Sequence, residues 1–211
     1  MNLLEKLLFG EFCAHCERRE VGAYGLVCDP CLYSLRPEPS FREVPYADGV
    51  LAFAPYKGAA KTLLNLIKFQ GAKKLLEPLA EVAKPTFERF LRKVDPDWVS
   101  FVPTHPLRVW FSRGFDQTEE LLKRLYPEYA RVFSRRWVPR RPLARLKGRE
   151  RRSAIKGVFE LRLPPPAVKG KRFLIVDDVV TTGSTAAELA LLLKSAGASE
   201  VFFFALFDGS A

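Results

Sequence analysis

The chain has 211 residues, which fits one α/β domain with at most a small additional module, and 48% of them are hydrophobic, which excludes intrinsic disorder. The formal net charge of +10 favours an anionic partner. No apolar run reaches the roughly 18–20 residues of a membrane helix, and the first residues, which include Glu5 and Lys6, do not form a secretory signal. We therefore expect a cytoplasmic protein without a transmembrane segment.

Hydrophobic periodicity predicts alternating helices and strands along the chain. The first part is expected to contain a short amphipathic helix at residues 1–9, strand Gly49–Pro55, helices Ala59–Phe69 and Leu75–Val94, strand Trp98–Val102 and helix Arg113–Leu125. Gly71 and Pro85 should each break or kink the helical pattern.

The strongest pattern closes the chain. A turn-rich connector with three prolines, Leu161–Arg172, precedes strand Phe173–Val176, helix Thr182–Ala196 and strand Val201–Phe207. Two apolar strands joined by such a helix form a βαβ unit. We therefore predict an α/β fold with a parallel sheet covered by helices.

All four cysteines lie near the start of the chain, in two Cys-x-x-Cys turns with 11 residues between them: Cys13, Cys16, Cys28 and Cys31. Two such turns supply the four thiolates of a tetrahedral zinc site, whereas disulfides would be reduced in the cytosol. We expect a structural zinc that organises residues 11–34 into a ribbon, with His15 as a bystander. Such ribbons bind nucleic acid or only hold an interface, and the sequence leaves both open.

An acidic pair, Asp177-Asp178, follows the predicted strand at residues 173–176. The next residues are rich in hydroxyls and open the predicted helix, so their amides and hydroxyls can surround a phosphate: Thr181, Thr182, Gly183, Ser184 and Thr185. Carboxylates beside a phosphate would repel it unless they hold the hydroxyls of an attached sugar, or a magnesium shared with more phosphate. The predicted ligand is therefore a sugar phosphate, although an acidic strand end that only caps a helix is the alternative.

The segment from Leu174 to Thr185, LIVDDVVTTGST, resembles the phosphoribosyl pyrophosphate (PRPP) signature of type I phosphoribosyltransferases. The resemblance implies that Asp177 and Asp178 hold the ribose hydroxyls and that the Thr181–Thr185 loop binds the 5′-phosphate. It also implies magnesium on the pyrophosphate.

A second half-site is suggested by Arg108 and Arg113, since arginine donors match phosphate geometry. The surrounding residues resemble the ComF (competence protein F) family, which has a Val-Pro-x-x-x-x-Arg loop and an Arg-Gly-Phe-Asn-Gln helix start. Here Asp116 replaces the Asn and adds a negative charge near the supposed anion site, unless it is only the N-terminal charge of a helix. His105 is either a general base or, more simply, polar surface.

Nine cations stand against one anion between residues 135 and 152, interleaved with Trp137. This mixture suits phosphate neutralisation with base stacking, and the residues expected to bind DNA are Arg135, Arg136, Arg140, Arg141, Arg145, Arg149, Arg151 and Arg152. A solvated loop with a charged helix at residues 147–156, or a loop over the active site, are the alternatives. Ala154 stands where the ComF pattern has Asn, and Leu143 stands where it usually has Gln. These departures argue against specific polar contacts by this segment but do not change its positive charge.

An amino-terminal zinc ribbon (residues 1–40) before a phosphoribosyltransferase-like domain (41–211) is the ComF arrangement. The resemblance implies a role in natural transformation, in which the protein handles imported single-stranded DNA in the cytoplasm beside the uptake helicase and binds PRPP or a related ligand. The alternative is an active transferase that attaches a nucleobase or other acceptor to ribose 5-phosphate.

Overall fold

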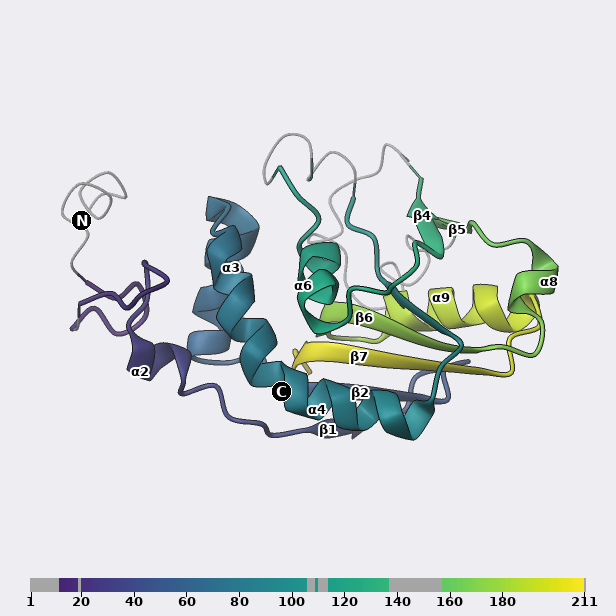
Figure 1. Cartoon of the computed structure of the whole chain (residues 1–211), viewed down its shortest axis with the longest axis horizontal. Coiled ribbons are helices and arrows are strands. Elements are labelled where there is room, and N and C mark those ends of the chain that lie inside the picture. Colours follow the sequence, from purple (N-terminus) through teal and green to yellow (C-terminus); the bar gives the residue numbers. More distant parts are fainter. Residues whose placement is uncertain (1–11, 19, 106–108, 110–113, 137–156, 211) are drawn as a thin grey trace.

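The computed structural model describes residues 12–18, 20–105, 109, 114–136 and 157–210 (Figure 1). The helix predicted at residues 1–9 and the charged helix at 147–156 lie outside this part of the chain. The elements are, in order, α2 (Asp29–Leu32), β1 (Ser40–Arg42), β2 (Gly49–Pro55), α3 (Ala59–Gln70), η1 (Lys73–Leu75), α4 (Leu76–Val94), β3 (Trp98–Phe101), α6 (Gln117–Leu125), β4 (Phe133–Arg135), β5 (Phe159–Leu161), α8 (Pro165–Val168), β6 (Arg172–Val180), α9 (Ser184–Ser195) and β7 (Glu200–Asp208).

A five-stranded sheet in the order β1-β2-β7-β6-β3 forms the centre of the molecule. Neighbouring strands from β2 to β3 run parallel, and only the short β1 is antiparallel, to β2. The register places Val50, Phe203 and Ile175 opposite one another on β2, β7 and β6. The predicted α/β fold with a parallel sheet is therefore confirmed.

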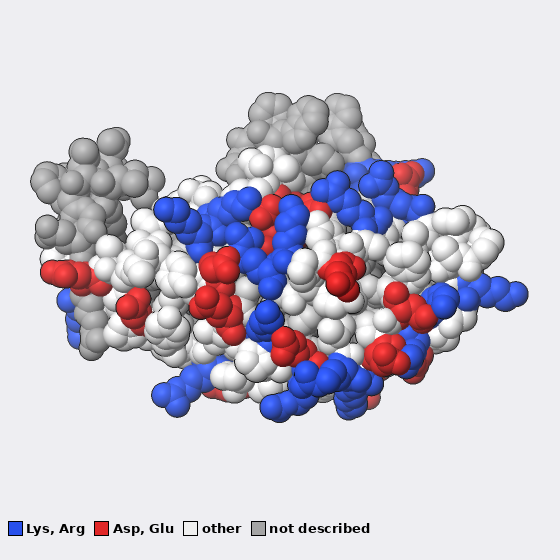
Figure 2. Space-filling model, in the orientation of Figure 1, with Lys and Arg blue, Asp and Glu red and all other residues white. Residues whose placement is uncertain are grey.

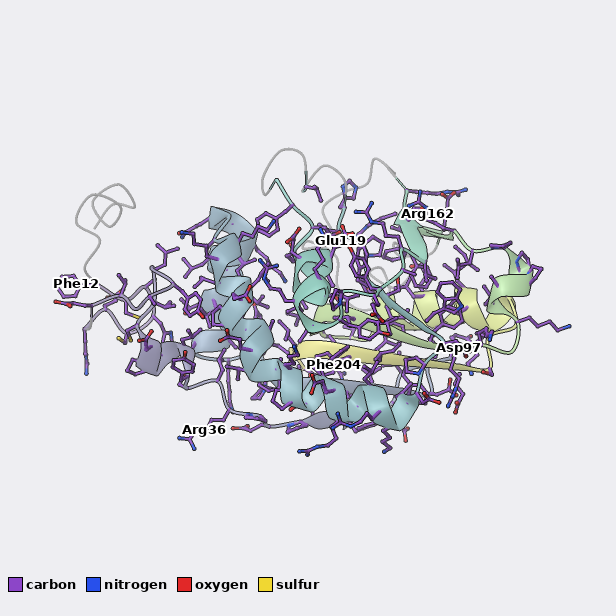
Figure 3. All side chains as sticks on the ribbon, in the orientation of Figure 1. Phe12, Arg36, Asp97, Glu119, Arg162 and Phe204 are labelled. Carbon is purple, nitrogen blue, oxygen red and sulfur yellow. The ribbon has the colours of Figure 1, made fainter. Side chains whose placement is uncertain are left out.

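Helices cover both faces of this sheet, which is why its central strands are continuous apolar runs. On one face α3, α4 and α6 pack on the sheet around Phe204 of β7 (Figure 3). The Phe87 ring of α4 meets the Phe204 ring edge-on, with 5.2 Å between the ring centres. On the other face Leu189 and Leu193 of α9 pack with Phe173, and the β4–β5 ribbon joins the same cluster. The carboxyl ends of four parallel strands consequently meet at one edge, between two helical layers.

Several predicted boundaries shift by one to four residues, and a predicted helix break is absent. Strand β6 continues to Val180, past the predicted end at Val176, because its ladder with β7 also continues, to the pair Val180–Asp208. Helix α4 runs unbroken through Pro85, which is exposed, so water can satisfy the carbonyl that loses its helical hydrogen bond. Gly71 does end α3, in a left-handed conformation with φ of 67°.

The cysteine segment packs directly on the core. Cys13, Cys28 and Leu32 belong to the same buried cluster as the inner face of α3. His15 Nδ1 also lies 3.0 Å from Thr62 Oγ1 of α3. The ribbon is thus docked on α3, while the domain boundary at residues 40/41 stays a prediction.

No helix in the described part of the chain is long and apolar enough to cross a membrane.

Candidate functional site

The two acidic residues lie near the carboxyl end of β6, at the sheet edge where ligands of open α/β folds bind. Asp178 faces α3 and α6, which supply its partners.

Asp178 is the point at which three elements converge. Its Oδ2 lies 2.8 Å from Lys68 Nζ of α3 and accepts a hydrogen bond of 2.6 Å from Gln117 Nε2 of α6. The residue is only 8% exposed, so the lysine compensates a carboxylate that has left water. These contacts favour the ionised form of Asp178 and join α3 and α6 to β6.

Asp177 has a different environment. Burial and the neighbouring charge of Asp178 raise its pKa to about 8, although the Asp178 backbone N–H donates to its Oδ1 at 2.8 Å. Adjacent carboxylates that are largely shielded from water cannot both ionise easily, because each charge disfavours the other. At neutral pH, Asp177 is therefore largely protonated, and the contact with Lys68 favours the charge on Asp178.

The loop after β6 has the features of a phosphate-binding turn. Gly183 has φ of 72° and occupies the N-cap position of α9, where it has no side chain to cap the helix. A Cβ at this position would lie 2.7 Å from Val44 Cγ2, so both conformation and space require glycine. Thr182 Oγ1 and Ser184 Oγ lie 2.8 Å apart, and together with the positive end of α9 they can receive an anion.

Arg42 of β1 contacts this loop and the end of β7. Its Nη1 donates to the Thr181 carbonyl oxygen at 2.5 Å and lies 3.2 Å from Asp208 Oδ1 at the end of β7. Ser40 Oγ donates to the other oxygen of Asp208 at 3.0 Å. Strand β1 therefore connects the end of the sheet to the start of the phosphate loop.

The second half-site is described only in part, because Arg108 and Arg113 lie outside the described residues. Asp116 is described, and it is the N-cap of α6. Its Oδ1 accepts from the Thr118 N–H at 3.0 Å, and its Oδ2 accepts from the Thr104 N–H at 2.7 Å. Burial raises the pKa of Asp116, and these hydrogen bonds oppose the shift. Asp116 thus ties the loop after β3, which includes the partly buried His105, to the start of α6.

The basic stretch enters the described structure only at its first two residues. The Arg135 guanidinium lies 5.2 Å from the centre of the Phe159 ring across the β4–β5 ribbon, and Arg136 pairs with Glu160. The candidate DNA-binding residues outside the described part are Arg140, Arg141, Arg145, Arg149, Arg151 and Arg152.

The four cysteines form a cluster whose Sγ atoms all lie within 4.8 Å of one another, and Cys16 Sγ is 3.9 Å from Cys28 Sγ. A tetrahedral zinc with Zn–S bonds of about 2.3 Å requires S···S separations of about 3.8 Å. Burial raises the pKa of Cys13, but the N–H groups of Cys16, Cys28 and His15 more than offset this and lower it to about 6. The donor set therefore fits a metal ion, with chemistry consistent with zinc. His15 contributes a backbone N–H to Cys13 Sγ at 3.4 Å, while its ring faces Thr62.

Lys68 and Arg42 were not predicted as site residues. Lys68 follows Ile67 in an amphipathic helix and resembles any helix-surface lysine, and Arg42 lies in a strand too short to predict. Gln117 had a signal, since it ends the Arg-Gly-Phe-Asp-Gln segment, but the sequence does not reveal its contact with Asp178.

Comparisons with known proteins were consistent with this site. Residues 124–211, which include β6, the loop and α9, match the model of the phosphoribosyl transferase domain family. A hypoxanthine phosphoribosyltransferase structure from Staphylococcus aureus is similar over 63% of this chain and 64% of its own length, at 14% identity and a TM-score of 0.37, and adds nothing to the assignment.

Relatives similar over most of the chain have names connected with DNA. The DNA utilization protein YhgH of Escherichia coli O6:H1 is 34% identical over 187 residues, covering 83% of this chain and 75% of the relative. The YhgH protein of Salmonella typhi is 33% identical, with 85% and 77% covered. Competence protein F of Haemophilus influenzae is 28% identical over 199 residues, with 90% and 81% covered.

Metal analysis tests the cysteine cluster. Protein purified under reducing, metal-replete conditions should contain about one zinc per chain, because four thiolates satisfy a closed structural site. Cys28→Ser should lose most of the zinc, and His15→Ala should keep it because only its backbone contacts a sulfur. A zinc content near zero in the wild-type protein would contradict this assignment.

The raised pKa of Asp177 predicts that the difference in stability between wild type and Asp177→Asn depends on pH. Between the ordinary carboxyl range and about pH 8 the folded chain binds more protons at Asp177 than the unfolded chain, so the free energy of unfolding falls as pH rises through this window. Asp177→Asn should therefore be more stable than wild type at pH 8–9, by more than ~1 kcal/mol, and the difference should shrink toward pH 5.

Urea unfolding at several pH values measures this difference, with Asp97→Asn as the control. The Arg172 N–H and Lys171 lower the pKa of Asp97, so its replacement should destabilise the protein at neutral pH. A difference between wild type and Asp177→Asn that does not change with pH would refute the assigned shift.

Proposed function

The chain belongs to the ComF family, and from this premise we propose that it binds PRPP or a related ribose phosphate and handles single-stranded DNA during DNA uptake. The names of its relatives, DNA utilization protein and competence protein F, support a competence role. A cytoplasmic location beside the uptake helicase is part of the same proposal.

One observation carries the ligand-binding part: the acidic pair of β6 adjoins a glycine-containing turn at the start of α9. Asp177 and Asp178 accept hydrogen bonds from the ribose hydroxyls. The hydroxyls and amides of Thr181–Thr185 hold the 5′-phosphate, with Gly183 allowing its close approach. Arg108 and Arg113 belong on the pyrophosphate side, where bound magnesium would neutralise charge.

The DNA-binding part is supported by charge. The stretch from Arg135 to Arg152 supplies +8 of the formal net charge of +10, and such a segment neutralises phosphates without reading sequence. Trp137 within it can stack on a base. The β4–β5 ribbon precedes and follows this stretch, and it is tied to α9 because the Val158 N–H donates to Glu188 Oε1 at 3.1 Å. The ribbon that flanks the stretch is therefore attached to the helix that follows the phosphate loop.

The zinc ribbon has a structural role in this proposal. It is docked on α3, the helix whose Lys68 contacts Asp178, so folding of the ribbon supports the position of the ribose site.

A second candidate function is transfer of ribose 5-phosphate to an acceptor base, which the match to the phosphoribosyl transferase domain model favours. In such a reaction pyrophosphate leaves as an oxocarbenium-like ribose develops, and anions near the ring stabilise it. Pyrophosphate release measured with PRPP, magnesium and a panel of nucleobases separates the candidates, because binding without release would reject the transferase.

Calorimetry with PRPP and magnesium tests the ribose site. The Asp177→Asn/Asp178→Asn double variant should lose at least about tenfold in affinity, because the charge-assisted hydrogen bonds that Asp178 offers to the hydroxyls become neutral ones. Asp97→Asn is the matched control, since Asp97 lies at the opposite end of the sheet, before β3 (Figure 3). Full affinity in a folded double variant would move the site elsewhere.

Salt dependence tests the DNA part. Affinity for single-stranded DNA should fall steeply with salt, with a slope of about −0.7 in log K per neutralised phosphate. Replacing Arg149, Arg151 and Arg152 by Gln should weaken binding and flatten that slope. A flat response in the wild type, or unchanged binding in the triple variant, would remove the DNA role from this stretch.

A further inference from the structure

We propose that Phe69, at the end of α3, is a stacking platform for a nucleobase next to the ribose site. This inference rests on the proposed function but adds a contact that neither the acidic pair nor the basic stretch provides.

Phe69 is unusual for a helix residue in this protein. Its side chain is 73% exposed, the largest exposed fraction among the large hydrophobic residues of the described chain. The apolar residues before it, including Leu63, Leu64 and Ile67, are buried against the sheet. Folding of α3 therefore gains little from a phenylalanine at position 69, where any polar residue could stand.

The position of Phe69 ties it to the ligand site. The preceding residue, Lys68, reaches Asp178 Oδ2 at 2.8 Å, so the backbone that carries the ring is anchored to the acidic pair. Consecutive Cα atoms are about 3.8 Å apart, so the ring is carried by backbone directly next to the residue that contacts the acidic pair. Gly71 then turns the chain into η1 and leaves Phe69 at an exposed corner.

Two other aromatic residues lack this combination of exposure and position. Phe115 lies two residues before Gln117, the other partner of Asp178, but it is partly buried and Lys73 Nζ lies 5.7 Å from its ring centre. Phe41 is 59% exposed, yet it packs edge-on against Phe90 at 6.0 Å on the outer strand β1. Within the described chain, Phe69 has no ring or cation partner of this kind.

Cations near Phe69 suit the phosphates that accompany a base. Lys73 and Lys74 of η1 are exposed and follow Phe69 by four and five residues. Lys73 shares Glu120 of α6 with Lys123, at 3.0 Å each, which extends the charged surface across α6. Figure 2 shows Lys and Arg side chains gathered along the upper part of this face, interrupted by a few acidic ones. An aromatic face beside cations is the combination that binds nucleotides without sequence preference.

The shared chemistry is the π-face of a nucleobase, which could come from a base of a DNA strand or from a free base bound beside PRPP. In both cases, binding should depend on the aromatic face of the Phe69 ring and not on its apolar area alone. Phe69→Trp should keep binding, whereas Phe69→Leu, which retains apolar area, should lose it as Phe69→Ala does.

The test compares these three variants with wild type and with Phe41→Ala as a matched exposed phenylalanine. Fluorescence anisotropy with labelled (dT)20, and with an abasic strand of the same length, tests the DNA source. Calorimetry with free nucleobases in the presence of PRPP and magnesium tests the other. A stacking contact predicts a loss of roughly tenfold in Phe69→Ala and Phe69→Leu, with the salt slope unchanged because no phosphate contact is removed.

Each outcome has one meaning. A loss confined to (dT)20, with the abasic strand unaffected, supports a strand base, and a loss confined to free bases supports an acceptor. If wild type binds (dT)20 or free bases and Phe69→Ala binds equally well, or if Phe69→Leu matches wild type, the inference is wrong although the proposed function stands. If wild type binds neither DNA nor PRPP, the proposed function itself fails.

Discussion

Two consecutive carboxylates on a buried strand are the constraint around which this molecule is organised. Neighbouring acids repel each other and lose hydration, so at least one needs a fixed partner. Lys68 and Gln117 supply it at a single oxygen of Asp178, and they come from α3 and α6 on either side of that position. The same helices cover one face of the sheet. The helices that cover this face of the sheet are therefore the same helices that stabilise the buried carboxylate.

The amino-terminal region supports the site from two sides. The cysteine ribbon docks on α3 through His15 and Thr62, and the segment that follows the ribbon reaches the phosphate loop through Arg42 and Val44. Loss of the metal would free the ribbon and loosen both supports, since metal binding and folding are linked in such modules. The ribbon is thus part of the binding architecture in addition to any contact of its own with nucleic acid.

The sequence predicted the fold and the local chemistry but not the long-range contacts. The βαβ pattern at residues 173–207 and the paired Cys-x-x-Cys turns are encoded locally, by periodicity and spacing, and the structure confirms the parallel sheet and the cysteine cluster. Lys68 and Arg42 approach the site only because the chain folds, and nothing in their neighbours marks them. Asp116 is different, because the sequence marks it as a replacement of the Asn in the ComF pattern. The structure explains this acid as the N-cap of α6, which also accepts a hydrogen bond from Thr104.

The electrostatics also resolve a difficulty that the sequence raises, namely that two acids beside a phosphate cradle should repel the ligand. Lys68 balances the charge of Asp178, and burial keeps Asp177 largely protonated below about pH 8. At neutral pH the two acids together with Lys68 are therefore close to neutral, while both carboxyl groups still offer oxygens to hydroxyl groups. The proposed ribose phosphate would therefore meet little repulsion, whereas a bare phosphate would gain nothing from the acids. Under the proposed function, selectivity for the attached sugar would thus follow from two different carboxyl environments on one strand.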